Sequence, residues 1–142
     1  MSNLTKEDLS LLMVDAIAAR EKSYCPYSGK SVGAALLCRD GKIYTGANIE
    51  SASFSPTVCA ERVAFFRALH DGERDFVAIA VSGGDKDMPS QEKFPPCGVC
   101  RQVMAEFCES DFVIVMGNPK SPDVYTLEQI LPLSFGKGEM NV

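Results

Sequence analysis

Apolar residues near the start of the chain recur at the spacing of one helix face. The residues that share this spacing are Leu9, Leu12, Met13, Ala16 and Ile17. Thr5 followed by Asp8 resembles the capping pattern that opens many helices. We therefore predict an amphipathic helix over residues 6–21, which ends before the turn around Pro26.

Short apolar runs bounded by turn signals predict five strands. In chain order they are residues 31–38, 42–49, 76–82, 112–116 and, more briefly, 124–125. Arg39-Asp40-Gly41 lies between the first two runs and is typical of a hairpin turn. The third run is almost wholly apolar, which indicates a strand buried on both faces.

Three further helices are expected between and after these strands. Ser55-Pro56 offers a capping hydroxyl and a proline for a first helical turn, so we expect a helix from there to about His70. Another is expected at residues 97–108, and a short one at residues 127–131. The polar, aperiodic residues 83–95 are expected to form a loop.

The order of these elements predicts the architecture. A helix, a hairpin and then alternating helices and strands indicate an α/β fold, in which helices cover both faces of a mixed sheet. A length of 142 residues fits one compact domain with a sizeable core, and no repeat or linker divides the chain. We therefore expect a single domain over residues 1–142.

Composition and charge narrow the classes of function. The net charge is −5 and the 14 Lys and Arg residues are scattered, whereas a nucleic-acid binder needs a basic stripe to neutralise phosphates. No apolar run reaches the roughly 18 residues of a membrane span. The first eight residues are polar and acidic, where a secretory signal would be basic and then apolar. We expect a cytoplasmic protein without membrane or nucleic-acid partners.

The six cysteines carry the most specific chemistry of the chain. In a protein that is not secreted they should be reduced thiols or metal ligands. Cys59 opens Cys59-Ala60-Glu61, and Cys97 and Cys100 stand in Pro96-Cys97-Gly98-Val99-Cys100. Three thiolates suit Zn²⁺ and leave its fourth tetrahedral position open, as in catalytic sites. The cysteines without a motif are expected to be small, partly buried side chains: Cys25, Cys38 and Cys108.

Both ligand groups fall at predicted helix starts, where unpaired N–H groups and the helix dipole favour thiolates. Cys59 can join the Cys-x-x-Cys pair if the two helix starts face each other. Glu61, two residues from a ligand, is well placed to move protons at the open position. Three thiolates leave Zn²⁺ with a net negative charge, and Arg62 and Arg101 are candidates to offset it. The alternative for both arginines is an exposed helix surface.

Two other interpretations of the cysteines are weaker. A Cys-x-x-Cys redox pair usually follows a strand directly, whereas two prolines and a polar loop precede this one. A structural zinc site would need a fourth ligand. The single histidine, His70, belongs to no ligand pattern.

The cysteine motifs resemble those of the zinc nucleoside deaminases, and the whole chain resembles the small, all-cysteine, homotetrameric cytidine deaminases. The likeness runs through residues 27–28, 32–36, 46–50, 59–62 and 97–102. It implies a three-layer α-β-α sandwich with a mixed, mostly five-stranded sheet and a Zn²⁺ cofactor. It also implies hydrolytic deamination of cytidine and 2′-deoxycytidine in pyrimidine salvage.

The resemblance further implies a role for several residues. Zinc-bound hydroxide would attack C4 of the cytosine ring, while Glu61 carries protons to ring N3 and then to the departing amine. Asn48 and Glu50, on one side of a strand end, would hydrogen-bond the ribose hydroxyls. Backbone groups near Ala60 would read the pyrimidine edge, and Phe135 would close the pocket of a neighbouring subunit.

One departure from the family leaves the substrate open. Lys30 stands where the family usually has an aromatic residue against the base, and Phe54 where it often has tyrosine. Either Lys30 turns to solvent while another ring covers the base, or the substrate is an anionic or modified cytosine nucleoside, such as blasticidin S. A non-enzymatic zinc-binding module would leave Glu61 without chemistry. A nucleic-acid-editing deaminase is disfavoured by the acidic charge.

Overall fold

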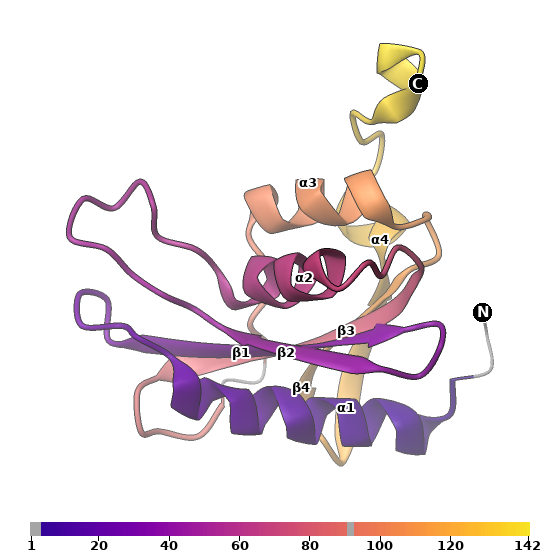
Figure 1. The fold of residues 1–142 in the computed structure, drawn as a ribbon. Helices are drawn as coiled ribbons and strands as arrows, with labels where there is room; N and C mark the ends of the chain where they lie inside the picture. Colours follow the sequence, from indigo (N-terminus) through magenta and orange to yellow (C-terminus); the bar gives the residue numbers. More distant parts are fainter. Residues whose placement is uncertain (1–3, 91–92) are drawn as a thin grey trace.

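A mixed five-stranded sheet forms the middle layer of the protein (Figure 1). The computed structural model describes residues 4–90 and 93–142. The strands are β1 (Lys30–Cys38), β2 (Ile43–Ala47), β3 (Phe76–Asp85), β4 (Val113–Asn118) and β5 (Ser121–Thr126). They lie in the order β2-β1-β3-β4-β5, with β3 and β4 parallel and the other neighbours antiparallel. Residues 1–3 of the polar start and 91–92 of the predicted loop lie outside the described residues.

Helices cover both faces of this sheet (Figure 1). Helix α1 (Lys6–Ala19) lies on one face and continues into the 3₁₀ turn η1 (Arg20–Lys22). Helices α2 (Ala60–His70) and α3 (Gly98–Phe107) lie together on the other face. The short α4 (Leu127–Ile130) follows β5, and the 3₁₀ turn η2 (Lys137–Met140) stands near the C-terminus. The predicted three-layer α-β-α architecture is confirmed.

The alternation of side chains along β1 builds a separate apolar layer on each side of the sheet. Val32, Ala34 and Leu36 belong to the core cluster that also contains residues of α2 and α3. The intervening Ala35 packs instead with Met13 and its neighbours on α1. This central strand is buried on both faces because each face has its own helical cover.

The predicted start of the second helix at Ser55-Pro56 is wrong. Residues before α2 are held in an extended pairing, in which Ile49 and Val58 exchange backbone hydrogen bonds of 3.0 and 2.9 Å. The helix therefore begins only at Ala60, and Cys59 is its N-cap rather than a residue of its first turn. A long-range backbone pairing has overridden the local helix signal.

The predicted loop at residues 83–95 also begins too early. Gly83 and Gly84 continue β3 and pair with β1, so that the strand ends at Asp85. A Cβ atom on Gly83 would lie 2.5 Å from the ring of Phe94, which shows that this glycine lets the following segment pack on the strand. The last strand, β5, is longer than predicted because it pairs with β4 along its whole length.

The first turn of α2 rests directly on β2 at a second glycine. A Cβ atom on Gly46 would lie 2.4 Å from the carbonyl oxygen of Ala60 and 2.6 Å from the amide nitrogen of Ala64. Any larger residue would push the start of the helix away from the sheet. The position of the turn that carries Cys59 and Glu61 is thus set by a backbone contact.

Candidate metal centre and active site

Three cysteine sulfurs from two helix starts lie together. Cys59 caps α2, Cys97 caps α3, and Cys100 lies in the first turn of α3. Their Sγ atoms all lie within 4.8 Å of one another, and those of Cys59 and Cys97 are 3.6 Å apart. The two helix starts therefore face each other, as the sequence led us to expect.

The donor set of this group matches a three-sulfur metal site. No His, Asp or Glu ligand atom among the described residues joins the three sulfurs. His70 is exposed at the far end of α2. Three convergent sulfurs without a fourth protein ligand fit a tetrahedral Zn²⁺ with one position left for solvent or substrate. The residues present therefore fit the metal that the sequence predicted.

The thiols of Cys59 and Cys100 differ in pKa. The hydrogen bond from the Cys100 thiol and, after it, the Arg62 guanidinium lower the pKa of Cys59 to about 5, although partial burial acts in the opposite direction. The pKa of Cys100 lies well above its usual range because its thiol donates to Cys59 and is buried. Cys59 is thus a thiolate at neutral pH.

Arg62 is placed to compensate this negative charge. Its Nη2 lies 3.4 Å from the Sγ of Cys59. Its Nε is buried without a hydrogen-bond acceptor among the described residues, a cost that further negative charge at the site would reduce. The other candidate, Arg101, donates to the carbonyl oxygens of Pro96 and Ile130 instead.

Glu61 is the second residue of α2 and is almost fully buried, with 3% of its surface exposed. Burial raises the pKa of Glu61 to about 7, and the charge of Cys59 acts in the same direction. A carboxyl group with such a pKa can both accept and release a proton near neutral pH. Glu61 lies close enough to Cys59 and Cys100 for its charge to interact with both thiols, so a group that can exchange protons stands beside the candidate metal centre.

Asn48 is buried and already makes several hydrogen bonds within the protein. Its Oδ1 accepts from the Ser23 hydroxyl at 2.5 Å and from the Val32 N–H at 2.9 Å. Its Nδ2 donates to the carbonyl oxygen of Lys30 at 2.8 Å. The expected strand-end residue is therefore also a bracket: it joins Ser23, directly after η1, to β1 and the end of β2, and its second amide N–H has no acceptor among the described residues.

Glu50 is held in a similar way by the segment before β1. Its Oε1 accepts from the backbone N–H groups of Tyr27 and Ser28 at 3.0 and 3.1 Å, and its Oε2 accepts from the Ser28 hydroxyl. The Ser28 hydroxyl first of all, and then these N–H groups, lower the pKa of Glu50, although burial acts slightly in the other direction. Sequence reasoning did not assign a role to Ser28, and only the fold brings it to Glu50.

Lys30 lies between Ser28, a partner of Glu50, and Val32, a partner of Asn48, and its side chain is about half exposed. Its N–H donates to the Ser28 hydroxyl, and its carbonyl oxygen accepts from Asn48. Its ammonium group forms an ion pair with Asp85, the residue directly opposite on β3. The backbone of Lys30 is thus fixed beside Asn48 and Glu50, while its side chain runs along the sheet.

Comparison with known proteins identifies the group to which this site belongs. The family model described as the cytidine and deoxycytidylate deaminase zinc-binding region matches residues 6–116. The chain belongs to this deaminase family. Its members are enzymes, and the cysteine and glutamate motifs lie within the matched residues.

Individual relatives agree with this assignment. The deaminase is 47% identical to a cytidine deaminase of Halalkalibacterium halodurans over 94% of this chain and 98% of the relative. It is similar to the crystal structure of the cytidine deaminase from Burkholderia pseudomallei, with a TM-score of 0.79 and 43% identity over 88% of this chain and 97% of the other. A blasticidin-S deaminase of Bacillus cereus is 32% identical over 94% of the chain.

Two expected site residues of the deaminase differ in burial. Ala60 is buried at the first position of α2, beside the sulfurs. Phe135 lies in the segment after α4 and is 59% exposed.

No helix among the described residues is both long and apolar enough to cross a membrane.

The hydrogen bonds of Asn48 predict a large effect on stability. Asn48→Ala leaves the buried Val32 N–H without its acceptor, and we expect the free energy of unfolding to fall by about 2–3 kcal/mol. Asn118→Ala is the matched control, because Asn118 is exposed and accepts one hydrogen bond in a turn. Its free energy of unfolding, measured by urea titration, should fall by less than about 1 kcal/mol. Equal losses in the two variants would contradict the bracket role.

Proposed function

We propose that this deaminase hydrolyses cytidine and 2′-deoxycytidine to uridine and 2′-deoxyuridine, with release of ammonia, in pyrimidine salvage. The observation that carries the proposal is the buried carboxyl group of Glu61 beside three convergent sulfurs. The names of the relatives, cytidine deaminases from two bacteria, support the same substrate class.

Cys59, Cys97 and Cys100 are the proposed ligands of one Zn²⁺ ion. Bound zinc supplies Lewis acidity, which lowers the pKa of a water molecule at the site. The low pKa of Cys59 and its contact with Arg62 support this role, because ligand thiols must lose their protons and the resulting negative charge needs a partner. Arg62 is accordingly the proposed charge-compensating residue.

Glu61 is the proposed proton carrier. Its carboxylate takes a proton from the attacking water and delivers it to ring N3, which makes C4 more electrophilic. The water oxygen bonds to C4, and Glu61 passes the second proton of that oxygen to the amino group. The C4–N bond then breaks, ammonia departs and C4 keeps a carbonyl oxygen. A pKa near 7 supports both directions of transfer.

The proposed sugar contacts use polar groups that Asn48 and Glu50 still offer after their hydrogen bonds within the protein. Asn48 offers the remaining N–H of its amide, and Glu50 offers carboxylate oxygen lone pairs to ribose hydroxyl groups. Cys59 caps α2 without a side-chain hydrogen bond, and the first N–H groups of a helix have no partner within the helix, so those around Ala60 would donate to the pyrimidine edge. The side chains of Asn48 and Glu50 are already held by the protein, so they would not need to be ordered when the substrate binds.

A modified cytosine nucleoside such as blasticidin S is the second candidate substrate. Lys30 favours it, because a lysine cannot offer the aromatic face that the family usually places against the base. The relative from Bacillus cereus carries the corresponding name. The ion pair with Asp85 favours cytidine instead, since the ammonium group of Lys30 is held by this carboxylate of β3 rather than left for an anionic substrate. The exposed rings of Tyr27 and Phe54, which pack edge to face, could cover the base.

We also propose that the chain is one domain that acts as a homotetramer in the cytoplasm. Six free cysteines suit a reducing compartment, and cell fractionation tests the location. Exposed apolar side chains that a partner subunit would cover include Ile43 on β2, Phe66 on α2, and Leu133 and Phe135 in the last residues. Phe135 would reach the pocket of a neighbouring subunit.

The proposed mechanism predicts that Glu61→Gln keeps the metal and loses turnover. The purified protein should hold about one zinc per chain, measured by elemental analysis, because one site has three ligands. The variant should retain this zinc and convert cytidine at least about 100-fold more slowly, since it cannot carry protons. Glu128→Gln on the exposed face of α4 is the control and should remain active. A fully active Glu61→Gln protein would rule out the mechanism.

Lys30→Phe tests the choice of substrate. If the ammonium group belongs to Asp85, the variant should change kcat/KM for cytidine by less than about tenfold. Asp85→Asn is the matched control, because it breaks the same ion pair without adding a ring. Absorbance assays with cytidine, deoxycytidine, their monophosphates and blasticidin S give the comparison. A much larger gain of Lys30→Phe on cytidine would show that the native substrate is a different one.

The proposed assembly predicts the mass in solution. Four chains of 15.4 kDa should be observed by light scattering at micromolar concentration, because the exposed apolar residues need a partner surface. A stable monomer under these conditions would exclude the tetramer and the proposed role of Phe135.

A further inference from the structure

Arg101 holds the backbone on both sides of a candidate metal ligand. Its Nε donates to the carbonyl oxygen of Pro96 at 2.8 Å, and its backbone N–H donates to the carbonyl oxygen of Cys97 at 3.0 Å. Pro96 is fully buried, whereas Cys97 itself is exposed. Packing alone therefore does not fix Cys97, and these two bonds orient the peptide from which its side chain leaves.

The same guanidinium group reaches a second element. Its Nη1 donates to the carbonyl oxygen of Ile130 at 2.7 Å, at the end of α4. The last carbonyl groups of a helix have no partner within the helix, and a cation is favourable there. Arg101 thus joins the turn before Cys97 to the end of α4. A lysine cannot make both contacts, because its single ammonium group lacks the planar fork of an arginine.

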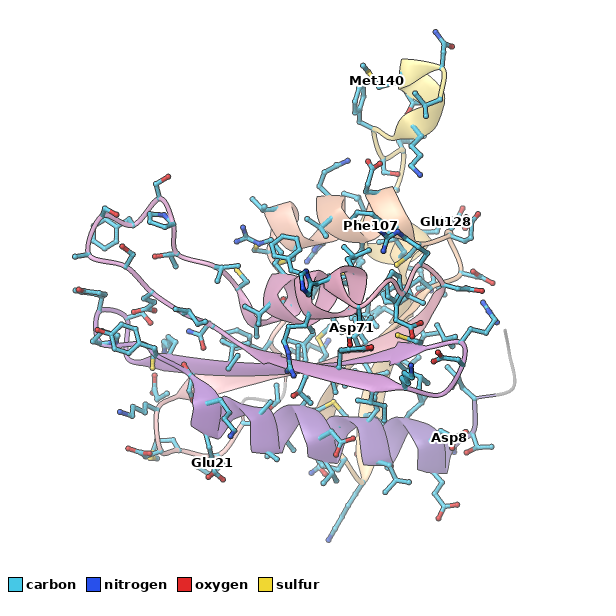
Figure 2. All side chains as sticks on the ribbon, in the orientation of Figure 1. Asp8, Glu21, Asp71, Phe107, Glu128 and Met140 are labelled. Atoms are coloured by element: carbon cyan, nitrogen blue, oxygen red, sulfur yellow. The ribbon has the colours of Figure 1, made fainter. Side chains whose placement is uncertain are left out.

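The next residue of α3 continues this connection. The Nε2 of Gln102 donates to the carbonyl oxygen of Phe135 at 2.7 Å. The C-terminal segment (residues 132–142) extends away from the sheet, and Met140 stands on the side of α3 that is remote from the sheet (Figure 2). A hollow of about 390 Å³ lies between this segment and α3. The segment is therefore held at its base rather than packed along its length.

We infer that Arg101 and Gln102 are positioning residues that tie the Cys97 turn to the C-terminal segment. Arg101 acts on both, because its guanidinium bridges Pro96 and Ile130. Gln102 acts on the segment alone. The direction in which Phe135 points thus depends on the start of α3. The consequences for turnover and for zinc retention rest on the proposed function, whereas the consequence for the motion of the segment does not.

Two variants separate these roles in the zinc-loaded full-length protein. Arg101→Lys should release zinc to a competing chelator about tenfold faster or more, since loss of a residue that supports a metal ligand weakens metal binding by about 10–100-fold. It should also speed amide hydrogen exchange in residues 131–142. Gln102→Leu should speed exchange around Phe135 and raise KM for cytidine, with zinc release unchanged. Circular dichroism checks that both variants are folded.

Each of the two variants has a matched control. Arg39→Lys alters a surface ion pair with Asp75, and Glu106→Gln alters a residue that lines the same hollow as Gln102. Both should behave as wild type in zinc release and exchange. Wild-type zinc release and exchange in Arg101→Lys, or unchanged exchange in Gln102→Leu, would overturn the inference. If the expected changes occur in a protein that does not act on cytidine, the proposed function fails and the inference stands.

Discussion

The side-by-side packing of α2 and α3 on one face of the sheet is the constraint on which the site depends. The candidate ligands Cys59 and Cys97 are 38 residues apart in the chain, and their sulfurs meet at 3.6 Å only because the two helices start at the same place. Gly46 lets the first turn of α2 rest on β2, and the buried Pro96 fixes the approach to α3. One backbone contact and one buried proline thus determine where a metal could be held.

The same packing creates the electrostatic contrast within the site. Glu61 is buried on the inner side of α2, so its carboxyl group keeps a proton up to about pH 7. Cys59, at the helix start beside Arg62, loses its proton far more readily. An acid and a thiolate two residues apart therefore differ because one is desolvated and the other receives hydrogen bonds. Asn48 is fixed by hydrogen bonds to Ser23 and β1, and Glu50 by hydrogen bonds to the segment before β1.

Local patterns predicted most of the elements, and they failed where a distant segment competed. The capping box of Thr5 and Asp8 starts α1 as expected, because both partners lie within one turn. Ser55-Pro56 has an equally good local signal, but Val58 pairs with Ile49 and keeps the backbone extended. Gly83 carries a loop signal, yet it continues β3 because its missing side chain admits Phe94. Pairing and close contact between remote residues cannot be inferred from the composition of a short window.

The sequence by itself determined the candidate chemistry of this protein, which is three thiols at metal-ligand spacing and a neighbouring carboxylate, and it determined the order of helices and strands. The reason is that the motifs are short and their spacing on a helix turn follows from the chain alone. Only the tertiary structure decided how these groups are used. It made Asn48 a buried bracket, gave Glu50 to Ser28, paired Lys30 with Asp85 and assigned Arg101 to carbonyl groups rather than to sulfur. Apart from Pro96, which lies five residues before Arg101, these partners lie far away in the sequence, and the packing of the layers brings them within hydrogen-bond distance.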